Sequence, residues 1–151
     1  MSNIQEKLDY VPAIKFKKIH DDAKLPTKNN PTDTGWDLYA VEDKTIPARG
    51  SAVVENGLQV AYISPGYWFQ ISPRSGMGFK SGIQPHLGVI DQEYRGSLGV
   101  KLYNFSDTDY QVKSGDRIAQ FVIYKRYDAE INWGEVEESS RGEKGFGSSG
   151  K

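Results

Sequence analysis

The stretch AIKFKKI (Ala13–Ile19) decides the fold class, because apolar and lysine side chains alternate along most of it. A two-residue period places the apolar side chains on one face of a β-strand. Outward from it, similar short runs predict strands at Ser51–Val54, Leu58–Ile63, Tyr67–Ile71, Ser97–Tyr103 and Arg117–Tyr124. Clusters of Gly, Pro, Asn and Asp separate these runs, and one short helix is expected at Ser75–Lys80. The pattern predicts an all-β, jelly-roll-like sandwich or barrel.

Composition narrows the function classes. The 151 residues suit one domain, 1–151, and the net charge of −1 argues against nonspecific binding to nucleic acid. Without cysteine there are no disulfides and no thiolate chemistry, and two histidines make a multi-histidine zinc site implausible. No apolar stretch is long enough for a membrane span, and the N-terminus lacks the apolar core of a signal peptide. A cytoplasmic location is therefore expected.

The segment GVIDQEYRG (Gly88–Gly96) carries the clearest chemistry. A short apolar run ends in Asp91, and the phenol of Tyr94 follows three residues later. Side chains at the end of a strand are held rigidly, as a catalytic base and a shape-selective wall need to be. Taken alone, the same residues also fit a β-hairpin whose polar turn only joins two strands.

The last residues differ in kind from the rest. Residues 139–151 (SSRGEKGFGSSGK) are rich in Gly and Ser, which predicts a mobile C-terminal tail. Phe146 is isolated within that tail. It is either accidental or a ring that stacks on a ligand when the tail closes, with Arg141, Ser148 and Ser149 available for phosphate oxygens.

Five segments occur in a fixed order along the chain. They are TGWDLYA (Thr34–Ala40), SPRSGMG (Ser72–Gly78), GVIDQEYRG, GDRIAQ (Gly115–Gln120) and RGEKGFGSSG (Arg141–Gly150). In order and spacing the chain resembles the trimeric dUTPase family from Thr34 onward, and its tail is similar to phage and bacterial members. The resemblance implies a dUTP diphosphatase of nucleotide metabolism that supplies dUMP and limits uracil in DNA. It also implies a homotrimer with sites at subunit interfaces, in the cytoplasm of a cell or of a phage host.

The resemblance also assigns roles to single residues. Asp91 is expected to activate the water that attacks the α-phosphate, and Tyr94 to press against the deoxyribose and exclude a 2′-hydroxyl. Arg74 and Ser75 are expected to bind phosphate oxygens, Arg74 across a subunit boundary, and Ser75 also has the right type for a helix N-cap. The remaining residues expected to bind substrate are Gly76, Val89, Ile90, Gly99, Gln120, Arg141, Phe146, Gly147, Ser148 and Ser149.

Among these, Phe146 is expected to stack on uracil, and Arg141 with Gly147, Ser148 and Ser149 to close over the γ-phosphate. The expected cofactor is Mg²⁺, held by substrate phosphates and water without a direct protein ligand. Asp37 either lies near the water shell of the metal or supports the fold. Members of the family usually have Tyr or Met where Trp36 stands.

One departure from the family pattern concerns the segment that reads the uracil ring. The family reads uracil with a β-hairpin that corresponds to Ile83–Gly88 here, and some bacterial members have an Asn six residues before the catalytic Asp. This chain has Pro85 at that position, and proline has no N–H to donate. Uracil recognition is then expected from neighbouring backbone groups, Gln84 or His86.

Three other functions remain open. A dCTP deaminase-type relative needs a Glu base near the pyrimidine, and Glu93 belongs to the turn after Asp91 instead. A dUTPase-like regulatory binding protein needs no catalytic acid. A β-barrel that binds single-stranded nucleic acid is disfavoured by the near-neutral charge.

Overall fold

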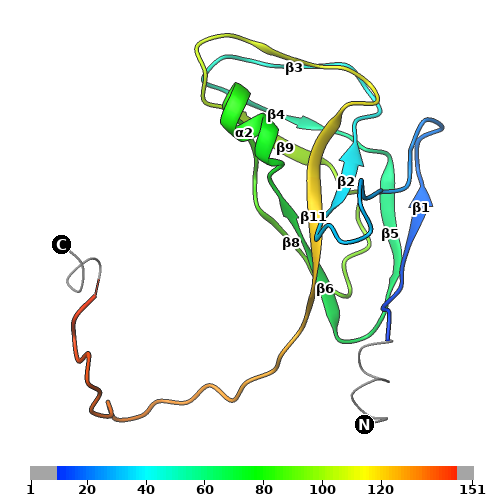
Figure 1. Cartoon of the computed structure of the whole chain (residues 1–151). Coiled ribbons are helices and arrows are strands. Elements are labelled where there is room, and N and C mark those ends of the chain that lie inside the picture. The colour runs from blue at the N-terminus through cyan, green and yellow to red at the C-terminus, as the bar shows by residue number, and fades with distance from the viewer. Residues whose placement is uncertain (1–9, 146–151) are drawn as a thin grey trace.

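The computed structural model describes residues 10–145, which form antiparallel strands and one short helix (Figure 1). The helix is α2 (Ser75–Ser81). The strands are β1 (Ile14–Lys18), β2 (Trp36–Tyr39), β3 (Lys44–Ile46), β4 (Ser51–Val54), β5 (Leu58–Ile63), β6 (Tyr67–Ser72), β7 (Ile83–Pro85), β8 (Gly88–Ile90), β9 (Val100–Asn104), β10 (Tyr110–Val112) and β11 (Arg117–Lys125). The all-β prediction with one short helix is confirmed.

The strands assemble into small sheets that enclose a common core. A four-stranded sheet has the order β2-β11-β6-β8, a three-stranded sheet has the order β4-β9-β7, and β1-β5 and β10-β3 form pairs. The Phe69 ring lies in the core, with its centroid 4.7 Å from that of Phe121 and 6.4 Å from that of Phe16. Trp36 stacks on Phe121 at 5.5 Å, so this departure from the family pattern adds aromatic packing to the core.

The alternation of side chains predicts the longer strands, whereas it does not reveal the shortest ones. β4 and β5 have the predicted bounds, whereas β9 begins at Val100 because Ser97 makes only an isolated bridge to Gln59. Strands of three residues, such as β7 and β8, are too short to show a period. Tertiary pairing therefore defines them.

The start of α2 corrects the prediction for Ser75. The N-cap is Arg74, with extended backbone and no capping hydrogen bond from its side chain, so Ser75 is the first helical residue. The helix ends at Gly82, whose φ of +68° is the left-handed conformation that glycine adopts without strain.

The expected hairpin at Ile83–Gly88 is wrong. β7 pairs with β9, whereas β8 pairs with β6, so this segment crosses from one sheet to another. Strand partners here are distant in sequence, and for that reason local spacing misidentified the pairing.

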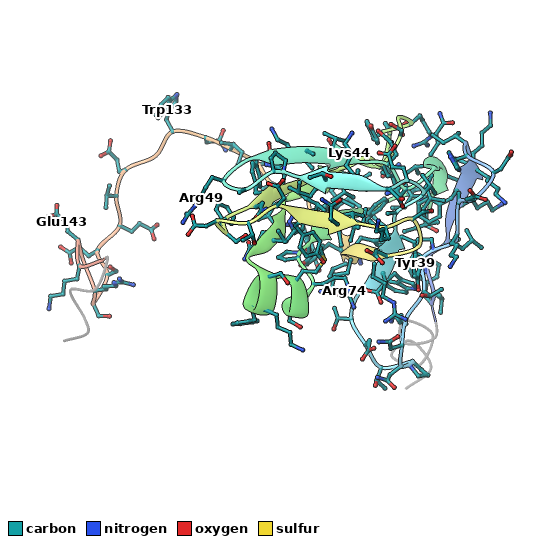
Figure 2. All side chains as sticks on the ribbon, turned by 90° about the horizontal axis from the view of Figure 1, so that it is seen from above. Tyr39, Lys44, Arg49, Arg74, Trp133 and Glu143 are labelled. Carbon is teal, nitrogen blue, oxygen red and sulfur yellow. The ribbon has the colours of Figure 1, made fainter. Side chains whose placement is uncertain are left out.

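Beyond β11 lie residues 126–145, which we call the arm; they are extended as far as Ser139 and end in a turn. It starts where the Arg126 amide donates to the Gly66 carbonyl at 2.7 Å, and it then leads away from the sheets (Figure 1). Its apolar side chains are almost completely exposed, and Trp133 lies far from the rest of the molecule (Figure 2). In residues 10–145 no helix is long and apolar enough to cross a membrane.

Candidate active site

Three strands bring distant residues together in a polar pocket beside α2. In the sheet register Gln120 of β11 lies opposite Asp37 of β2 on one side and Ser72 of β6 on the other. Arg74 follows β6 and enters the same space. The resulting pocket has a volume of about 310 Å³ and is lined by Asn29, Asp33, Thr34, Gly35, Asp37, Arg74, Ser75, Gly76 and Gln120.

An ion pair fixes Arg74 in this pocket. Its Nε donates to Oδ1 of Asp37 at 3.0 Å, and Nε of Arg117 lies 3.7 Å from Oδ2 of the same carboxylate. Asp37 is 9% exposed, so its charge is compensated by both guanidinium groups rather than by bulk water. Within the described residues no hydrogen bond engages the Nη atoms of Arg74. The guanidinium is therefore anchored by one edge, and its other donors are available to an anion.

Arg117 has a second neighbour in this network. The Tyr39 phenol and the Thr27 hydroxyl share a short hydrogen bond, and this bond lowers the pKa of Tyr39 from its ordinary value. Burial opposes that shift, whereas Arg117 adds to it through a hydrogen bond and its charge. Asp37 and Tyr39 thus hold Arg117 between them on the β2–β11 pair.

Gln120 supports the approach to α2. Its Nε2 donates to the Pro73 carbonyl at 2.8 Å, which ties β11 to the residue before Arg74. A Cβ at Gly35 would lie only 2.0 Å from Oε1 of Gln120, so the side chain lies directly over this glycine. The amide therefore positions the Arg74 segment.

Four pocket residues were missed by the sequence analysis: Asn29, Asp33, Thr34 and Gly35. The loop before β2 carries only a turn signal, in which the Asn30 amide donates to the Asp33 carboxylate at 3.0 Å. Thr34 and Gly35 open the segment TGWDLYA, and that motif is the one signal that could have found them.

Asp91 lies in a tight turn directly after β8. The Tyr94 amide donates to the Asp91 carbonyl at 3.0 Å and closes the turn. Asp91 is exposed, and within the described residues its carboxylate makes no hydrogen bond. It therefore caps nothing in residues 10–145, and its oxygens are free to accept from water or ligand.

The Asp91 turn and the Arg74 pocket lie at opposite ends of β6. Ile90 pairs with Phe69, so in the same register Asp91 lies level with Trp68, six residues before Arg74. At 3.3 Å per residue the two positions are roughly 20 Å apart along the strand. One chain by itself therefore does not bring Asp91 to the Arg74 pocket.

A family model described as dUTPase matches residues 21–150. The chain belongs to the dUTPase family.

Relatives agree along nearly the whole chain. Deoxyuridine 5′-triphosphate nucleotidohydrolase of Arabidopsis thaliana is 42% identical over 140 residues, covering 92% of this chain and 84% of that protein. The protein of the same name from Kluyveromyces lactis is 45% identical, covering 92% and 95%. A relative from Dictyostelium discoideum, named as mitochondrial, is 40% identical and covers 90% and 76%.

Solved structures agree with the fold. A Staphylococcus bacteriophage 80alpha dUTPase with dUpNHpp superposes with a TM-score of 0.82 at 29% identity, covering 91% of this chain and 98% of that one. A mutant dUTPase of phage phi11, described for its coordination of a structural Mg(II) ion, has a TM-score of 0.75 at 25% identity and covers 84% and 99%.

Among the described residues, the other predicted ones lie outside the pocket. Val89 is exposed, Ile90 packs against the core, and a Cβ at Gly99 would lie 3.0 Å from Cγ1 of Val53. Arg141 lies near the end of the arm, where its Nε donates to the Lys144 carbonyl. The predictions for Phe146, Gly147, Ser148 and Ser149 fall outside the described residues.

Gln84 and His86, the side chains expected to read the base, are both exposed on either side of Pro85. Nδ1 of His86 lies 3.0 Å from the Tyr103 hydroxyl, and the His86 amide donates to the Lys101 carbonyl at 2.8 Å. Gln84 packs against Gly78 of α2. His86 therefore contacts β9 and Gln84 contacts α2.

Proposed function

We propose that this protein hydrolyses dUTP to dUMP and pyrophosphate at sites that are shared between the subunits of a homotrimer. Membership of the dUTPase family supports dUTP diphosphatase activity. The observation that carries the shared site is the separation of Asp91 from Arg74 along β6. The cytoplasmic location stays a prediction.

Asp91 would supply the base. Its carboxylate orients a water oxygen toward the α-phosphorus and accepts a proton as that oxygen forms the new P–O bond. The bond from the α-phosphorus to the bridging oxygen breaks, and pyrophosphate leaves with the electron pair. Because the turn fixes Asp91 and its carboxylate is free, most of its effect comes from position.

The pocket beside α2 would bind the phosphates. Arg74 presents its free Nη donors, and the backbone N–H groups of Ser75 and Gly76 lie in the first turn of the helix, where they lack carbonyl partners within the helix. Asp37 keeps Arg74 in this orientation, which favours the role of supporting the fold for this carboxylate. Gln120 acts on the same segment through Pro73.

A magnesium ion is compatible with the donors that are present. In the described residues no group of three or more His, Asp or Glu side chains could hold a metal ion. Such a surface suits an ion that keeps its waters and binds mainly to substrate phosphates. When bound, Mg²⁺ supplies charge neutralisation on the phosphates.

A second copy would complete each site. We infer that the arm mediates this assembly, because Ala129, Ile131 and Trp133 alternate with polar residues as in a strand that lacks a sheet. The strand β1 pairs only with β5 among the described residues, which leaves its other edge free.

Shape and charge on β1 match the arm. An apolar groove of about 320 Å³ beside this edge is lined in part by Ile14, Phe16 and Trp36. β1 carries three lysines, whereas residues 127–138 carry five acidic side chains and no basic one. The arm of a second copy therefore suits the β1 edge by both its apolar face and its charge.

The tail would close each site. Arg141, Gly147, Ser148 and Ser149 are proposed to cover the γ-phosphate and Phe146 to stack on uracil, a contact worth roughly 1–3 kcal/mol. Closure of the tail excludes water from the charged groups and aligns the phosphates for in-line attack. Val89, Ile90 and Gly99 complete the proposed substrate contacts, with Val89 and Ile90 touching the nucleoside through their backbone.

Release of pyrophosphate tests the proposal. With Mg²⁺ present, we expect turnover of dUTP and little turnover of UTP, dTTP or dCTP. The absence of turnover with dUTP would contradict the proposal and favour a regulatory binding protein. Release of ammonia from dCTP would instead assign the chain to the deaminase branch.

A further inference from the structure

The Tyr94 ring is seated by two contacts within its own turn. Its hydroxyl donates to the Ser97 carbonyl at 2.7 Å, so the phenol bends back over the backbone. The ring lies against Gly96: a Cβ there would be 2.3 Å from Oη, 2.5 Å from Cζ and 2.9 Å from Cε1. Carbon atoms in contact prefer about 3.5–4.0 Å, so only a glycine leaves room for this position of the ring.

The backbone of the turn is held by other groups. The Gly66 amide donates to Oε1 of Gln92 at 2.9 Å, and Nε2 of Gln59 donates to the Arg95 carbonyl at 2.6 Å. Nη1 of Arg95 donates to the Gln92 carbonyl at 2.8 Å. The Tyr94 amide and carbonyl also take part in bonds of the turn, but the Tyr94 side chain takes part in none of the bonds that hold its backbone. A side chain added at position 96 will therefore displace the ring and leave the backbone in place.

Gly96 itself tolerates the change. Its φ is not positive, unlike those of Gly66 or Gly82, so an alanine can adopt its backbone conformation. The conflict is with the far end of the Tyr94 ring, which can swing away because 40% of this residue is exposed. The substitution Gly96→Ala is thus a selective way to move one ring.

We propose that Gly96 is a specificity-determining residue: it sets where the Tyr94 ring stands and thereby sets the preference for a 2′-deoxyribose over a ribose. This proposal rests on the proposed function, in which the Tyr94 ring is the wall against the sugar. The exposed ring swings away from the added methyl group, admits the 2′-hydroxyl and speeds UTP. This displacement lowers the ratio of kcat/KM for dUTP to that for UTP.

This ratio separates specificity from general damage. Loss of the fold, of the trimer or of Asp91 geometry lowers both rates together and leaves the ratio unchanged. We expect Gly96→Ala to lower the ratio about tenfold or more, since discrimination by a wall depends on its position. Tyr94→Phe, which loses only the bond to Ser97, should lower it about threefold to tenfold.

A double-mutant cycle decides whether Gly96 acts through the ring. Tyr94→Ala removes the wall, so Gly96→Ala in that background should change the ratio less than twofold. Ser97→Ala is the matched control, because it keeps the carbonyl that accepts the phenol bond and should hold the wild-type ratio. A wild-type ratio in Gly96→Ala, or an equal drop in both backgrounds, would overturn the proposal. Inactivity of the wild type with dUTP would instead refute the proposed function.

Discussion

The Asp91 turn and the Arg74 pocket are the two ends of one strand, and they are built in opposite ways. Neutral hydrogen bonds tie the turn to Gly66 and Gln59, Arg95 donates within the turn itself, and the Asp91 carboxylate makes no hydrogen bond in the described residues. The pocket is held by ion pairs, in which the Asp37 carboxylate contacts both Arg74 and Arg117. A free base thus lies at one end of β6 and an anchored cation at the other, roughly 20 Å apart along the strand direction. A single substrate can meet both only if a second copy supplies one of them.

Removal of the catalytic base from the turn should cost the most activity. We expect Asp91→Asn to lower kcat by roughly 10²–10⁴-fold, the contribution typical of a positioned general base. Affinity for a non-hydrolysable dUTP analogue, measured by calorimetry, should stay within a few-fold. Asp107→Asn is the control, because that carboxylate pairs with Arg49 at the surface. Equal loss of binding and rate in Asp91→Asn would indicate a structural role.

Removal of the Arg74 guanidinium should weaken phosphate binding in the pocket. We expect Arg74→Ala to lower kcat/KM by roughly 10²-fold with a marked rise in KM, because phosphate binding loses its anchored donor. The free energy of unfolding should fall by about 1–3 kcal/mol, since the buried Asp37 keeps only its longer contact with Arg117. Arg49→Ala removes an exposed ion pair and should change neither quantity. Unchanged kinetics in Arg74→Ala would contradict the assignment.

The link between the two ends is tested through the arm. We expect Trp133→Ala to weaken the trimer by about 2 kcal/mol or more if this side chain fills the groove beside β1. Sedimentation velocity should then show dissociation at concentrations where the wild type is a trimer, with activity falling on dilution. If the Trp133→Ala trimer is as stable as the wild-type trimer, the arm contact is refuted. If the wild-type protein is itself a monomer, the result favours docking of the arm within its own chain.

The mildest of these substitutions removes the Gln120 amide from the pocket. Gln120→Ala loses the bond to Pro73, worth about 1 kcal/mol, and should raise KM several-fold while kcat changes less. Gln111→Ala is the matched control, because its bond to Thr45 lies on exposed strands away from the pocket. Equal effects of the two substitutions would show that Gln120 has no positioning role.

The sequence predicted the elements whose signal is local. Alternation over four to six residues predicted β4 and β5 with their bounds, and the order of five motifs predicted the family. It did not reveal that Arg74 contacts Asp37, because this pair is separated by 37 residues and depends on the register of β2, β11 and β6. The wrong hairpin has the same origin, since β7 and β8 pair with strands that no local spacing identifies.

The shared site is tested most directly by mixing two inactive subunits. Asp91→Asn and Arg74→Ala chains are unfolded together in equal amounts, refolded into mixed trimers and assayed for pyrophosphate release from dUTP. If each site takes Asp91 from one subunit and Arg74 from its neighbour, about a quarter of the sites in random trimers combine two intact residues. Recovery of about a quarter of the wild-type activity is therefore expected, and mixed trimers that remain as inactive as their parents would refute a site shared between subunits.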